Sequence, residues 1–140
     1  MAALSQLLFP AVVAVVLLLL GPPAPTPVTG APNTAVVSTL CNSAAYTAGD
    51  PFATSLAYVL SDLLAVVPGR KGHDYYNISP YPNAFAYGHA ACTADLSAGD
   101  CSSCLSFAVE QMNSTCGMRI GARSVLVDCT TIYEQYPFVN

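Results

Sequence analysis

The pattern of apolar and polar positions after residue 30 predicts strands, then two helices with strands between them, then strands again. Runs rich in β-branched and aromatic residues, bounded by turn residues, are typical of strands. One such run is short and lies inside a polar, proline-containing loop. The expected strands are residues 33–42, 75–78, 84–92, 122–129 and 131–136.

Two segments carry helical spacing. Asp50 and Pro51 form a strong helix start, because Asp can cap the free N–H groups and Pro suits the first turn. Pro68-Gly69 ends this helix. The second helix is expected to begin at Ser97, a capping residue, with Asp100 in its first turn. Helical periodicity predicts two core-facing stripes: Phe52, Leu56, Val59, Leu60 and Leu63 in the first helix, and Cys104, Leu105, Ala108 and Met112 in the second.

This order of elements indicates an α+β fold. Consecutive strands that pair without long crossovers form an antiparallel sheet, and amphipathic helices must bury their apolar stripes against it. We therefore expect an antiparallel sheet with both helices on one face.

Residues 1–30 are interpreted as a secretory signal peptide, and residues 31–140 as one domain. The stretch from Leu7 to Leu20 is uncharged, shorter than a bilayer span and interrupted by Pro10. Val28-Thr29-Gly30 offers the small residues of a cleavage site before Ala31. The n-region lacks Lys and Arg, so an uncleaved anchor stays as the alternative.

Charge and composition narrow the classes of partner. The net charge is −4, with four basic against eight acidic residues. A weakly acidic domain is a poor electrostatic match for nucleic acid or anionic membrane. No second long apolar stretch predicts a membrane span once the signal is removed. The N-x-[ST] triplets at Asn77 and Asn113 are candidate N-glycosylation sites in a secreted chain.

Six cysteines all follow residue 40. Three of them form the pattern C-x8-C-x2-C that begins at Cys92; one cysteine precedes this pattern and two follow it. An even number in a short exported chain predicts three disulfides. Spacing alone leaves the pairing open, except that Cys101 and Cys104 lie one helical turn apart and should have different partners. The six are Cys41, Cys92, Cys101, Cys104, Cys116 and Cys129.

A metal or redox role for Cys101-x-x-Cys104 is disfavoured. A structural zinc site needs four ligands, and His73 and His89 lack the spacing to complete one. A redox motif is expected after a strand in a βαβ unit of a reducing compartment, whereas this one falls in a predicted helix. We therefore expect no metal and no cofactor.

The chain resembles the plant ginkbilobin-like family, also called the stress-antifungal or salt-stress-response domain, the ectodomain unit of cysteine-rich receptor-like kinases. The cysteine spacing carries the resemblance, together with an Asn-Thr-Ala segment at residue 33, Cys41-Asn42, and Ala86-Tyr87-Gly88. Ile120-Gly121-Ala122-Arg123 and Tyr133-Glu134-Gln135 direct it toward ginkbilobin, an antifungal seed protein that binds mannose. The resemblance covers essentially all of residues 31–140.

The resemblance implies two helices on a five-stranded antiparallel sheet, with disulfides Cys41–Cys116, Cys92–Cys101 and Cys104–Cys129. It also implies a mannose-binding site at Asn42, Arg123 and Glu134. Arg donors and Glu acceptors suit a sugar diol, because charge-assisted hydrogen bonds are the stronger kind. The apolar wall of the site is expected from Tyr46, Tyr133 or Phe138.

The leading interpretation is a secreted, mannose-binding antifungal defence protein whose partner is mannose or mannan of the fungal wall. The alternative is an apoplastic protein-interaction module without useful sugar affinity. In that case Asn42 satisfies backbone groups at a strand end, and Arg123 and Glu134 form an exposed cross-strand ion pair. The sequence shows no nucleophile–base pair and no carboxylate dyad, so we do not expect an enzyme. The sequence leaves the oligomeric state and the glycan linkage open.

Overall fold

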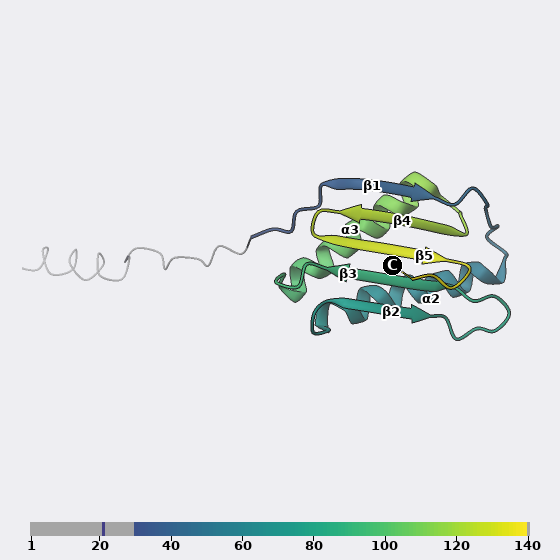
Figure 1. Ribbon diagram of the computed structural model, residues 1–140, viewed down its shortest axis with the longest axis horizontal. Helices are drawn as coiled ribbons and strands as arrows, with labels where there is room; N and C mark the ends of the chain where they lie inside the picture. Colours follow the sequence, from purple (N-terminus) through teal and green to yellow (C-terminus); the bar gives the residue numbers. More distant parts are fainter. Residues whose placement is uncertain (1–20, 22–29, 140) are drawn as a thin grey trace, which may run out of the picture. The chain divides into compact units, whose positions relative to one another are not determined.

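The computed structural model describes residue 21 and residues 30–139, so the proposed signal segment lies outside the described residues apart from residues 21 and 30. Five strands form one antiparallel sheet in the order β1-β4-β5-β3-β2. Figure 1 shows the sheet face-on, with both helices behind it. The bounds are β1 Val36–Cys41, α2 Pro51–Val66, the 3-10 turn Val67–Gly69, β2 Asp74–Ile78, β3 Tyr87–Cys92, α3 Ala98–Cys116, β4 Gly121–Leu126 and β5 Cys129–Glu134.

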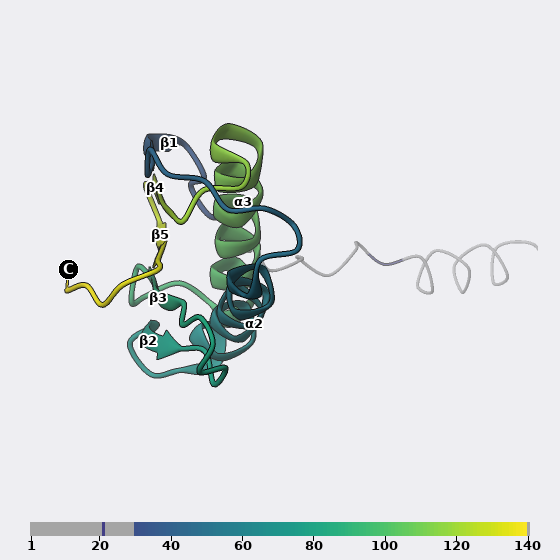
Figure 2. The same ribbon diagram turned by 90° about the vertical axis from the view of Figure 1, so that its right-hand side faces the viewer.

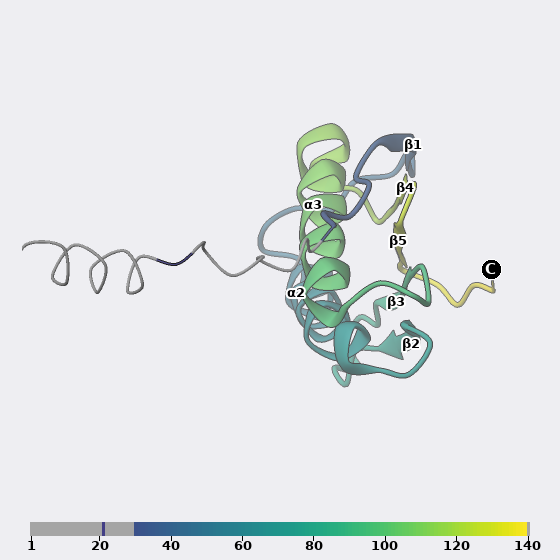
Figure 3. The same ribbon diagram turned by 90° about the vertical axis from the view of Figure 1, so that its left-hand side faces the viewer.

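The α+β prediction is confirmed, with both helices on one face of the sheet (Figures 2 and 3). Both helix starts follow the local chemistry read from the sequence. Asp50 accepts a hydrogen bond from the backbone N–H of Phe52, and Ser97 accepts one from that of Asp100. These caps fix where each helix begins.

The core lies between the helices and the inner face of the sheet. Phe52, Val59 and Leu63 of α2 are almost fully buried, as are Leu105 and Met112 of α3. Strand alternation supplies the opposing layer from every second residue. These sheet residues are Ala90, Ala122, Leu126 and Tyr133.

Three disulfides tie one helix to three different strands. They are Cys41–Cys116, Cys92–Cys101 and Cys104–Cys129, the pairs implied by the family resemblance. Each has one cysteine in α3 and the other in β1, β3 or β5. Cys101 and Cys104 have different partners, as their positions one turn apart require.

Several predicted strand boundaries were wrong. The first strand begins at Val36 instead of residue 33. Residue 129 begins β5 instead of ending β4, because Val127 and Asp128 form the turn between them. The backbone N–H groups of this turn donate to the carbonyls of Ala35 and Asn33. Residues 84–86 belong to the β2–β3 connection, which the Ser79–Ala86 hydrogen bonds close. Strand β5 ends at Glu134, after which the chain bends back.

Among the described residues, one helical stretch, Pro51–Gly69, is long and apolar enough to cross a membrane by those two criteria alone. In the fold its apolar stripe packs on the sheet. Its half-buried Asp62 faces the edge strand β2, where it accepts hydrogen bonds from the side chains of Tyr75 and Asn77. The composition therefore reflects a core helix of this domain.

Candidate functional site

The three predicted sugar-binding residues lie on the outer face of the sheet, opposite the helices. Arg123 on β4 lies between Leu40 of β1 and Ile132 of β5. Glu134 lies one row further along, opposite Gly121. Asn42 continues β1 into that row, since its backbone N–H donates to the carbonyl of Gly121 at 2.9 Å. The pairing of β1 with β4 thus brings together Asn42 and Arg123, which are 81 positions apart in the sequence.

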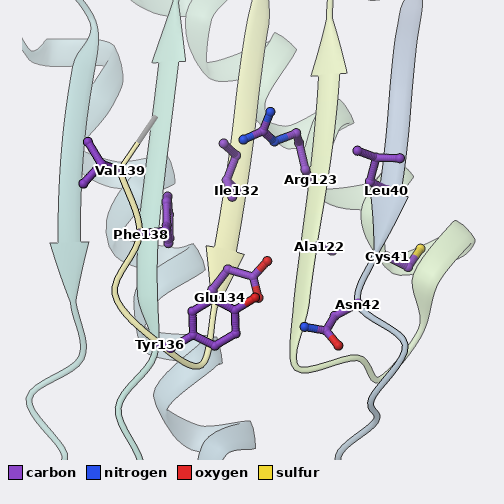
Figure 4. Close-up of a pocket in the computed structure, with 10 residues that line it drawn as sticks. All are labelled: Leu40, Cys41, Asn42, Ala122, Arg123, Ile132, Glu134, Tyr136, Phe138 and Val139. Atoms are coloured by element: carbon purple, nitrogen blue, oxygen red, sulfur yellow. The ribbon is translucent and has the colours of Figure 1, made fainter.

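Asn42, Arg123 and Glu134 line one pocket of about 410 Å³ (Figure 4). Its floor is the outer face of β1, β4 and β5. The C-terminal segment after β5 supplies further lining residues. The remaining lining residues are Leu40, Cys41, Ala122, Ile132, Tyr136, Phe138 and Val139.

Asn42 is held from two sides. The Arg119 guanidinium donates to the backbone carbonyls of Asn42 and Ser43, at 3.0 and 3.1 Å. The side-chain oxygen of Asn42 accepts from the backbone N–H of Ala44 at 2.9 Å. With its oxygen engaged, the amide group directs its N–H donors toward the pocket, where Asn42 hydrogen-bonds the Glu134 carboxylate. Asn42 does satisfy backbone at a strand end, and it lines the pocket as well.

The Glu134 carboxylate is subject to opposing influences. Partial burial raises the pKa of Glu134 above its ordinary value of 4.5. Hydrogen bonds from Asn42 and Tyr136 and the positive charge of Arg123 lower that pKa, but burial prevails. Its Oε2 atom is buried and has no hydrogen-bond partner within the described structure. Such an acceptor can gain a hydrogen bond when a ligand hydroxyl reaches it.

Arg123 and Glu134 are diagonal neighbours across β4 and β5, because the residue opposite Arg123 is Ile132. Both side chains are partly buried, so they differ from the exposed cross-strand pair of the alternative interpretation. Figure 4 shows the Arg123 side chain reaching from β4 toward β5, with its guanidinium pointing away from the Glu134 carboxylate. The positively charged donor, Arg123, and the negatively charged acceptor, Glu134, therefore lie at different positions along the pocket.

Of the three aromatic residues expected to form an apolar wall, only Phe138 lines the pocket. Tyr133 follows strand alternation onto the inner face, where burial raises its pKa to about 12 and its hydroxyl donates to the Arg119 carbonyl at 3.0 Å. Tyr46 packs edge-to-face on Phe52 in the core layer. Tyr136 was missed, because its position depends on the bend after Glu134.

The two sequons differ in their surroundings. The side chain of Asn77 lies under α2, where its amide donates to the Val59 carbonyl and to Asp62, both at 3.0 Å. Asn113 is exposed near the end of α3. In the folded chain, Asn113 is therefore the accessible candidate for glycosylation.

The histidines take structural positions. His73 is buried, with Nδ1 3.2 Å from the Val67 carbonyl and Nε2 2.8 Å from the Leu96 carbonyl. His89 lies 2.8 Å from Asp74 and stacks on Tyr76. Within the described residues, no group of three or more His, Cys, Asp or Glu side chains could hold a metal ion.

Comparison with known proteins places this chain within a family. Residues 40–136 match the model of the salt stress response/antifungal family. The chain is 40% identical over 110 residues to the antifungal protein ginkbilobin-like protein 1 of Picea glauca, covering 77% of each chain. It is also 40% identical over 112 residues to the antifungal protein ginkbilobin-2 of Ginkgo biloba, covering 79% of this chain and 83% of the relative.

Solved structures of similar fold come from plant receptor-like proteins. The tandem DUF26 ectodomain of Arabidopsis thaliana PDLP8 superposes with a TM-score of 0.61 at 28% identity, over 74% of this chain. That of PDLP5 superposes with a TM-score of 0.68 at 22% identity, over 75% of this chain, and shows the fold alone. This chain covers 46% and 52% of those two ectodomains, about half of each.

Proposed function

The chain belongs to the salt stress response/antifungal family, and from that membership we propose that it is a secreted, mannose-binding antifungal defence protein of a plant. The observation that carries the proposal is the convergence of Asn42, Arg123 and Glu134 on one pocket. The curated relatives that the chain matches over most of its length are named antifungal proteins, which supports a role in defence. The partner we propose is mannose, or mannan of the fungal wall.

The chemistry of the pocket suits a neutral polyol. A hexose presents neighbouring hydroxyls that each donate and accept a hydrogen bond. Arg123 supplies donors, Glu134 supplies acceptors, and Asn42 holds Glu134 in place. Because binding exchanges sugar–water for sugar–protein hydrogen bonds, we expect a monosaccharide Kd on the order of millimolar to high micromolar. The proposal assigns no catalytic step to these residues.

Secretion belongs to the same proposal. Removal of residues 1–30 would release residues 31–140, which contain the whole described fold. Three disulfides suit an oxidising compartment, where they persist. Mass spectrometry of the secreted protein, with and without reduction, would show the start near Ala31 and the absence of free thiols.

A second candidate function is favoured by the edge strand β1. Val36, Val37 and Leu40 are 45%, 65% and 61% exposed on this edge. An exposed apolar edge strand is a ready site for pairing with another chain. The family also includes receptor-like ectodomains, so a protein-interaction module without sugar affinity is the alternative.

Calorimetric titration with mannose, together with a mannan pull-down, separates the two candidates. The proposal expects saturable binding by the disulfide-bonded protein and its loss in the Arg123→Ala variant. Absence of binding to either ligand by the parent protein would overturn the lectin function and leave the interaction module.

A further inference from the structure

We propose that the pocket accommodates two sugar units of a mannose-containing glycan, not a single hexose. The first unit would lie at the polar end, formed by Asn42 and Glu134. The second would lie against an outer subsite, defined as Ile132, Phe138 and Val139, on the side of the pocket away from β1. This inference rests on the proposed function, since it specifies the ligand of the same pocket.

The volume of the pocket is the first argument. At about 410 Å³, it falls within the range of roughly 300–1,000 Å³ that accommodates drug-sized ligands. One hexose ring is smaller than such ligands and would leave part of the pocket to solvent. A ligand that contacts the polar end alone would therefore leave the outer subsite unused.

The distribution of side chains is the second argument. Asn42 and Glu134 lie in the row where β1 and β5 end, and Tyr136 adds a hydrogen bond to that carboxylate. The next row holds Leu40, Arg123 and Ile132. Figure 4 shows Phe138 and Val139 alongside this second row, on the C-terminal segment. The pocket thus changes from polar to apolar along its length, with Arg123 in the apolar part.

Exposure is the third argument. Val139 is 94% exposed, although it lines the pocket. Phe138 is fixed by its contact with Tyr76, at 6.3 Å between ring centroids. A ligand that covers these side chains removes apolar surface from water, which favours binding.

A sugar ring suits the outer subsite better than a lipid or a charged group. A pyranose has an apolar C–H face that packs on aromatic and aliphatic side chains, and hydroxyls on its edge that reach a donor such as Arg123. Because Arg123 and Glu134 carry opposite charges, a neutral ligand leaves the charge of the pocket balanced. A second neutral sugar unit therefore completes the pocket.

The test compares methyl α-mannoside with mannobioses of α1,2, α1,3 and α1,6 linkage by calorimetry on the disulfide-bonded protein. Covering the outer subsite should make at least one mannobiose bind about fivefold or more tightly than methyl α-mannoside. Phe138→Ser and Val139→Ser should narrow that ratio. Matched controls are Val37→Ser on β1 and Val127→Ser in the β4–β5 turn, both exposed valines outside the pocket lining, and both should keep the ratio of the parent.

The outcomes separate this inference from the function on which it rests. Equal affinity for methyl α-mannoside and all mannobioses would overturn the second subsite while leaving mannose binding intact. A gain for 4-nitrophenyl α-mannoside alone would also overturn it, because the subsite would then accept an apolar group and not a sugar. If no ligand binds, the proposed function fails as well.

Discussion

The Glu134 carboxylate lies directly over Gly121, its partner across β4 and β5. A Cβ atom at position 121 would occupy the space of that carboxyl group. The glycine therefore allows a charged side chain to lie flat against the neighbouring strand. The position of Glu134 depends on a residue that contributes no functional group of its own.

Replacing Gly121 with Ala should weaken mannose binding about tenfold or more while changing stability little. The new methyl group meets the far end of a flexible side chain, which can move away, and Ala suits a strand better than Gly does. Calorimetry and thermal unfolding on the same sample measure the two effects. Gly49→Ala is the matched control, since nothing lies within 4 Å of its Cβ. Unchanged affinity in Gly121→Ala would show that sugar binding does not need Glu134 in this position.

Mannose binding should weaken as pH falls through the pKa of Glu134. The ionised carboxylate is the stronger hydrogen-bond acceptor, and burial raises its pKa above 4.5. The loss should therefore begin at a higher pH than for an exposed glutamate. Titrations between about pH 4 and pH 7 measure it. A pH-independent affinity in the parent would contradict the role of Glu134, whereas the Glu134→Gln variant should lack this dependence.

The raised pKa of Glu134 also determines the direction in which folding stability changes with pH. Because the folded state favours protonated Glu134, its stabilising contribution is complete below pH 4.5 and is lost as pH rises through the folded-state pKa. Relative to Glu134→Gln, the parent should therefore lose stability over that interval. Denaturant unfolding of both proteins at a series of pH values measures the difference. A parent that gains stability over the interval would show that Arg123 and the hydrogen bonds outweigh burial.

Local chemistry determined what the sequence could predict. The caps at Asp50 and Ser97 act within three residues, so both helix starts were predicted correctly. The β4–β5 boundary failed because the turn at Val127 and Asp128 bonds to a segment more than 90 residues earlier. The propensities of neighbouring residues do not indicate a contact so distant in the sequence.

The candidate site was likewise predicted only in part from the sequence. The family resemblance supplied Asn42, Arg123 and Glu134, and the sheet brings them into one pocket. Gly121 carried a weaker signal: it begins β4, two residues before Arg123, and a glycine in a strand can mark the close approach of another group. Tyr136 and Val139 carried no such signal. Their contribution depends on the bend that returns the C-terminal segment across the outer face.

Loss of the disulfides should destabilise the fold in the order of the chain segments they close. The sequence separations are 75 for Cys41–Cys116, 25 for Cys104–Cys129 and 9 for Cys92–Cys101. Loop-closure entropy then gives costs of about 4.5, 3.5 and 2.6 kcal/mol. Denaturant unfolding of the three double Cys→Ser variants measures them. Single substitutions should fold worse than the matching double ones, because a lone cysteine can mispair. An inverted order would show that native packing, not chain entropy, sets the cost.

Arg123→Ala should abolish mannose binding and reduce fungal growth inhibition together. Arg123 is the pocket's cationic donor group, so its loss removes charge-assisted hydrogen bonds that water cannot replace in the complex. Glu134→Gln should cost less, because it keeps the shape of the side chain and part of its hydrogen bonding. The melting temperature should fall little, since a partly exposed charged group contributes little to stability.

Arg70→Ala, on a basic residue outside the pocket lining, is the control. Calorimetry and a hyphal growth assay on the same preparations distinguish the outcomes: retained mannan binding would refute the lectin function, whereas lost binding with retained inhibition would separate the sugar site from the antifungal mechanism.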